Sequence, residues 1–127
     1  MRLWLILSGL NGFVAIAAGA FGAHGLQSIA DSAQLSAFET GANYHLLHAM
    51  ALLGVAALGH LAPSSGGIRA AGWLFVTGII LFAGPLYLYG TMGSKALIMV
   101  TPVGGLTLMV GWSLLAIAGF KLKGHQG

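Results

Sequence analysis

The chain has 127 residues, of which 57% are hydrophobic and 6% are charged, whereas soluble domains carry about a quarter charged residues. This composition excludes an ordinary soluble domain, and the absence of cysteine excludes disulfides and thiolate metal ligands. The net charge is +3, but the five Lys and Arg residues stand singly, so no basic stripe is available to follow a nucleic acid.

Four long apolar segments follow one another along the chain. About twenty helical residues, at a rise of about 1.5 Å each, cross a hydrocarbon core of about 30 Å. We therefore predict an all-α membrane protein, a single four-transmembrane-helix bundle over residues 1–127. The expected spans are 3–21, 42–61, 70–89 and 96–120.

The first segment admits a second interpretation, a secretory signal peptide. Arg2, a Leu-rich run and the small residues at 18–20 resemble such a peptide with its cleavage site. We favour a retained span, because its small residues would otherwise be lost as a packing surface for the other three helices.

The connection between the first two spans contains a helical pattern of its own. Over Gln27 to Phe38, apolar residues recur on one face and Asp31, Ser32 and Gln34 fall on another. The segment is too short to cross a bilayer, so we expect a short interfacial helix between helices 1 and 2.

The basic residues predict the orientation. Arg2, Arg69, Lys121 and Lys123 fall on one side of the predicted bundle, and Lys95 alone falls on the other. Because cytoplasmic loops carry the excess of Lys and Arg, we expect both termini in the cytoplasm.

Small residues recur along the predicted spans at spacings that bring them to one helical face. In lipid, such residues let helix backbones approach closely. We expect the following glycines to serve helix packing: Gly12, Gly19, Gly104 and Gly111. A phosphate-binding loop is excluded, because no G-x-x-x-x-G-K pattern occurs.

Two prolines, Pro85 and Pro102, fall inside predicted spans, where each would free a carbonyl one turn earlier. Trp112 lies deep enough in the last span that its N–H is expected to find an acceptor within the bundle.

Polar side chains gather toward the outer side of the predicted bundle. His45 and His48 share one face of the second span, and His48 should lie within the apolar layer. An ionisable residue at that depth is a functional candidate. The candidate polar patch comprises His24, Tyr44, His45, His48, Tyr87 and Thr101.

Three interpretations of the patch stay open. The histidines can hold the helices in register by hydrogen bonds to Tyr, Thr or freed carbonyls, which we favour. Alternatively, His24, His45 and His48 provide three imidazole ligands for a metal, with Asp31 or Glu39 as outer acceptors, or His48 relays a proton or ion. We expect no catalytic residue and no cofactor, because no nucleophile motif or acid/base pair is present.

Several motifs in order resemble the DUF423 family of small membrane proteins, which includes bacterial members and the eukaryotic transmembrane protein 256 group. They are residues 19–24 (GAFGAH), Thr40-Gly41 with Tyr44 and His48, Leu81-Phe82 through Leu86-Tyr87, residues 101–105 (TPVGG), and Gly111-Trp112. The chain departs from the family pattern at Ala83 and Pro85, where serines are common, and at His45, where bacterial relatives often have Gln.

The resemblance implies a four-helix protein of the bacterial inner (plasma) membrane or of an organellar membrane, with no activity assigned. We expect a non-enzymatic component, embedded in the lipid bilayer, that supports membrane integrity or joins a homo-oligomer or larger membrane complex. The alternative is a module that binds or transports an ion, metal or small ligand through the polar patch.

Overall fold

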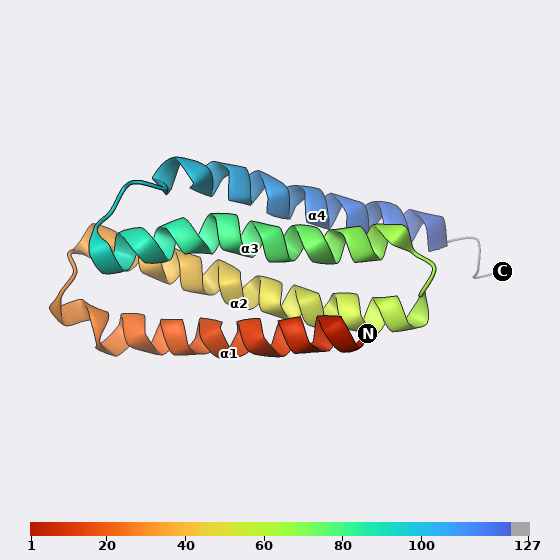
Figure 1. Ribbon diagram of the computed structural model, residues 1–127, viewed down its shortest axis with the longest axis horizontal. Coiled ribbons are helices and arrows are strands. Elements are labelled where there is room, and N and C mark those ends of the chain that lie inside the picture. The colour runs from red at the N-terminus through yellow and green to blue at the C-terminus, as the bar shows by residue number, and fades with distance from the viewer. Residues whose placement is uncertain (123–127) are drawn as a thin grey trace.

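The computed structural model describes residues 1–122 and consists of four long antiparallel helices (Figure 1). All four are long and apolar enough to cross a membrane, which confirms the predicted all-α bundle. Lys123, used above to predict orientation, lies outside the described residues. The helices are α1 (Arg2–His24), α2 (Ser32–Leu61), α3 (Gly66–Met92) and α4 (Thr101–Lys121), with short 3-10 helices η1 (Leu26–Ser28) and η2 (Ile98–Val100).

The connection between α1 and α2 differs from the expectation of a separate interfacial helix over 27–38. The 3-10 helix η1 covers only Leu26–Ser28, and α2 runs without interruption from Ser32. Asp31 sets this start, because its carboxylate accepts from the Gln34 N–H at 2.8 Å while the Gln34 side chain accepts from the Asp31 N–H at 3.1 Å. This capping box begins the helix ten residues before the expected span at 42.

The last helix, in contrast, begins later than the expected span at 96. Residues before Thr101 form a turn and η2, so Pro102 lies in the first turn of α4 rather than inside a span. Proline fits there because the first helical N–H groups have no intrahelical partner. Pro85, in contrast, lies within the continuous helix α3.

The four helices pack mainly against their neighbours in the chain. α2 and α3 form the central pair, α1 packs on α2, and α4 packs on α3 (Figure 1). The start of α1 and the end of α4 lie at the same end of the bundle, together with the turn between α2 and α3. We call this the terminal end and the opposite one the loop end.

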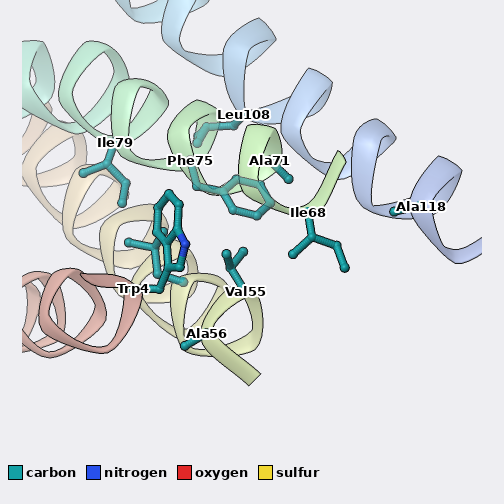
Figure 2. Close-up of a cluster of buried hydrophobic side chains, with 10 residues drawn as sticks. Trp4, Val55, Ala56, Ile68, Ala71, Phe75, Ile79, Leu108 and Ala118 are labelled. Carbon is teal, nitrogen blue, oxygen red and sulfur yellow. The ribbon is translucent and has the colours of Figure 1, made fainter. Parts of the chain in front are cut away.

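The largest apolar cluster lies toward the terminal end and joins all four helices (Figure 2). Phe75 is fully buried at its centre, and Trp4 reaches from α1 across to Gly72 of α3. A Cβ atom on Gly72 would meet the Trp4 ring at 2.6 Å, so this indole position requires glycine. The cluster comprises Trp4, Leu52, Val55, Ala56, Ile68, Ala71, Phe75, Ile79, Leu108 and Ala118.

The predicted packing glycines lie in different surroundings. Gly104 lies directly against the α3 backbone at Leu81 and Phe82, and Gly111 lies against the Phe75 ring. A Cβ atom on Gly12 would lie 4.0 Å from the Ala49 Cβ, an ordinary contact. At Gly19, no atom of another described helix lies within 4 Å of the Cβ position, so a packing role for this residue stays a prediction.

Candidate functional site: two histidines that join four helices

His45 and His48 are the two buried polar side chains of the described residues, each 5% exposed. They lie three residues apart on α2, so their side chains project from the same side of the helix. His48 is nine residues beyond Glu39, a rise of about 14 Å into the apolar layer. A polar ring at that depth needs hydrogen-bond partners from the protein.

His45 connects α2 to α1 and α3. Its Nε2 lies 2.8 Å from Oδ1 of Asn11, and its Nδ1 lies 2.9 Å from the Tyr87 hydroxyl. The Asn11 amide nitrogen already donates to the Leu7 carbonyl at 2.8 Å, so its Oδ1 is the acceptor and the His45 Nε2–H donates. In the neutral ring, Nδ1 then accepts from the Tyr87 O–H.

His48 connects α2 to α4 with the opposite arrangement of donor and acceptor. The Trp112 indole N–H donates to the His48 Nε2 at 3.0 Å, and the His48 Nδ1 lies 2.7 Å from the Tyr44 carbonyl. An indole N–H can only donate, so Nε2 carries the lone pair and the proton resides on Nδ1. His48 is therefore neutral in this geometry.

Aromatic rings surround His48 on several sides. Its ring centroid lies 5.5 Å from Phe75, 5.8 Å from Trp112 and 6.3 Å from Tyr44, whose plane is nearly parallel at 9°. Each neighbour comes from a different direction in the bundle, so the ring is fixed in orientation as well as bonded.

All four ring nitrogens of the two histidines therefore take part in hydrogen bonds. Neither ring keeps a spare lone pair to offer a metal ion in this arrangement. Within residues 1–122, no group of three or more His, Asp or Glu side chains is close enough together to hold a metal ion. The arrangement joins helices through directional bonds at a depth where water cannot replace them.

The structure brings together part of the candidate polar patch. His45 meets Tyr87, and His48 meets the carbonyl and the ring of Tyr44. His24 is exposed at the end of α1, apart from this network. Thr101, at the start of α4, has a buried hydroxyl oxygen with no partner among the described residues.

Two partners of the histidines came from outside the predicted patch. The structure confirms that the Trp112 N–H finds an acceptor within the bundle, and identifies it as His48. Asn11 was missed in the sequence, although a lone amide in an apolar span is itself a signal of interhelical hydrogen bonding.

The fold and the histidine network define a small multi-pass membrane protein whose four helices are joined in the apolar layer. The chain belongs to the DUF423 family, described as "Protein of unknown function (DUF423)", whose pattern matches residues 18–105. The resemblance stated from the motifs is thereby confirmed.

Bacterial relatives match along nearly their whole length. The chain is 40% identical to the UPF0382 membrane protein SAB0533 of Staphylococcus aureus, over 98% of this chain and 100% of the relative. It is 36% identical to the UPF0382 membrane protein YwdK of Bacillus subtilis, over 95% of this chain and 98% of the relative. A UPF0382 membrane protein of Haemophilus influenzae is 38% identical, over 94% and 95% of the two chains. No solved structure matches the chain.

Proposed function

We propose that this protein is a non-enzymatic membrane component, a rigid four-helix unit that supports membrane integrity or a larger membrane complex. The observation that carries this proposal is the use of every ring nitrogen of His45 and His48 in bonds that join helices or fix the ring. A buried histidine that served acid/base chemistry would instead need a nitrogen free to reach a substrate.

The outer faces of α1 and α4 supply the surfaces for association in this proposal. Phe13 on α1 and Met109 on α4 are large apolar side chains that no described helix covers. In a bilayer, such faces contact lipid tails or another membrane helix. A second copy of the chain or a different membrane protein would bind there.

Gentle extraction tests this role. We expect native membranes dissolved with an amphipathic copolymer to release the protein with a second copy or another membrane protein in a fixed ratio, measured by native mass spectrometry. Release as an isolated monomer, at native expression and without detergent, would contradict the proposal.

We further infer that both termini face the cytoplasm, in the inner membrane of a bacterium. Arg2, Arg69 and Lys121 belong to helix ends at the terminal end, whereas Lys95 follows α3 at the loop end. This distribution supports the orientation through the excess of positive charge on cytoplasmic loops. Cysteine labelling in intact cells tests it: a Cys at Lys95 should react with an impermeant reagent, and a Cys at Arg69 should not.

A binding module is the second candidate function, and a cavity beside His48 favours it. The metal form of this hypothesis is tested by elemental analysis of the purified protein together with His48→Ala. Bound metal that is lost in the variant would favour that form over the structural role. Unchanged metal content between the two proteins would remove His48 from any such site.

A further inference from the structure

A cavity of about 260 Å³ lies between α2, α3 and α4, next to the bond between His48 and Trp112. Trp112 is 48% exposed and Tyr44 is 44% exposed, so the cavity opens to the surroundings between α2 and α4. Residues from three helices line it, including Tyr44, His48, Phe82, Gly105, Met109 and Trp112.

The position of this cavity determines which molecules can reach it. His48 and Trp112 lie within membrane-spanning helices, well beyond the charged residue Glu39. The mouth of the cavity therefore faces lipid rather than water. An occupant must dissolve in the bilayer and enter from the side.

The volume limits the occupant to one ring or a comparable group. A cavity of about 150 Å³ is enough to hold benzene, whereas pockets for drug-sized ligands begin at about 300 Å³. The observed cavity of about 260 Å³ lies between these values. A substituted single ring fits within this volume, whereas most of a fused four-ring sterol would lie outside it.

The walls favour a flat ring over a flexible chain. The ring centroids of Tyr44 and Phe82 lie 4.7 Å apart. The Trp112 ring forms the wall on the side of α4. Aromatic side chains bind other rings by offset stacking and edge contacts, which a saturated chain cannot match. At Gly105, a Cβ atom would still be 3.7 Å from the Phe82 ring, so the missing side chain leaves space for the guest.

One lining residue, Tyr44, carries a hydroxyl that favours an occupant with an oxygen atom on its ring. The Tyr44 hydroxyl has no hydrogen-bond partner within the described residues and can donate to a carbonyl oxygen. The Trp112 N–H is not available to the occupant, because it donates to the His48 Nε2. A purely hydrocarbon occupant would leave the Tyr44 hydroxyl without a partner from the occupant.

We propose that this cavity binds a membrane-dissolved molecule whose head is one flat, oxygen-bearing ring of the quinone or phenol class. The site goes beyond the structural role of the bundle. It needs no change in the histidine network, because His48 stays bonded to Trp112 while the guest contacts their faces.

A short-tailed benzoquinone is a suitable probe, since it dissolves in lipid and quenches indole fluorescence on contact. We expect the full chain in nanodiscs of phosphatidylcholine and phosphatidylglycerol to show a saturable quenching component above the linear collisional one. Gly105→Leu fills the cavity and should abolish the saturable component. Gly119→Leu, on the same helix with open space around it, is the matched control and should retain it.

Tyr44→Phe keeps the ring and removes the hydroxyl, so it tests the polar contact even where Gly105→Leu fails to fold. We expect binding about threefold to tenfold weaker, the loss of one hydrogen bond. Purely linear quenching in the parent chain would overturn the proposal. So would unchanged binding in both variants, or equal competition by the alkyl tail without its ring, since a plain acyl-chain groove would then account for the cavity.

Discussion

The packed cluster toward the terminal end and the middle of the bundle around His45 and His48 are held together in different ways. Around Phe75, side chains from all four helices interlock without any polar atom in the cluster apart from the Trp4 indole nitrogen. Around His45 and His48, three helices attach to α2 through hydrogen bonds in which each donor faces one acceptor. The same bundle thus combines a region held by apolar packing with a region held by hydrogen bonds.

The difference shows what each kind of contact can specify in lipid. Close packing depends on shape, and it brings helices together wherever small residues allow the approach. A hydrogen bond between buried groups additionally fixes register, because a shift of one residue leaves both groups unpaired. We expect the Phe75 region to supply most of the stability and the histidine region to supply alignment.

The largest effect should follow from emptying the packed region. Phe75→Ala removes a fully buried ring, and we expect a loss of about 3 to 5 kcal/mol in the free energy of unfolding. Reversible unfolding in mixed micelles measures it. Phe13→Ala, at a ring 76% exposed, is the matched control and should change stability by about 0.5 kcal/mol or less. Equal losses at both positions would contradict the central role of Phe75.

A smaller loss in the free energy of unfolding should follow when a single methyl group is added between α3 and α4. A Cβ atom on Gly104 would overlap the α3 backbone, which cannot rotate away as a side chain can. We expect Gly104→Ala to cost about 1 to 3 kcal/mol in the same unfolding assay. Gly105→Ala, whose Cβ atom meets only ordinary contacts, should be close to neutral. A comparable cost there would contradict the close approach of Gly104 to α3 as the cause of the loss.

The hydrogen bond between His48 and Trp112 should give a small coupling energy in the free energy of unfolding. In a double-mutant cycle of His48→Ala and Trp112→Phe, we expect a coupling energy of about 0.6 kcal/mol, with about 1.7 kcal/mol as the upper end for membrane hydrogen bonds. Additive losses, with no coupling, would mean that the contact between these rings contributes packing alone.

The smallest effect is expected at Gly19, which lies on α1 like Gly12 but has no atom of another described helix within 4 Å of its Cβ position. Gly19→Ala should leave the unfolding free energy of the isolated chain within about 0.5 kcal/mol of the parent. A loss as large as that of Gly104→Ala would mean that another surface covers this face of α1.

The sequence was sufficient to predict the four spans, because charges and turn residues interrupt long apolar runs. It did not predict where α2 and α4 begin. The capping box at Asp31 starts α2 well before the expected span at 42, and Gly41 lies within the helix, where a Cβ atom on it would meet Leu86 at 3.2 Å. Pro102 indicates a helix start as readily as a kink, and only the turn before it decides between them.

The site was predictable only in part, because hydrogen-bond partners depend on how one helix is aligned with the next. Spacing along α2 was enough to pair His45 with His48 on one side. The contact of Asn11 with His45 depends on the register of α1, to which Ser8 contributes by donating to the Ala49 carbonyl at 2.8 Å. His24 belongs to the same set of sequence motifs as His48. It is the last residue of α1, however, and its side chain is exposed there.

The central claim, that two neutral histidines join the helices with opposite tautomers, has a direct spectroscopic test. Nitrogen-15 solid-state NMR of histidine-labelled protein in lipid at neutral pH should show His45 protonated at Nε2 and His48 protonated at Nδ1, each assigned by its loss in the His45→Gln or His48→Gln variant. The Trp112→Phe variant should alter the His48 signals and leave those of His45 in place. A cationic His48, or a His48 protonated at Nε2, would contradict the account, because neither form can accept the Trp112 N–H.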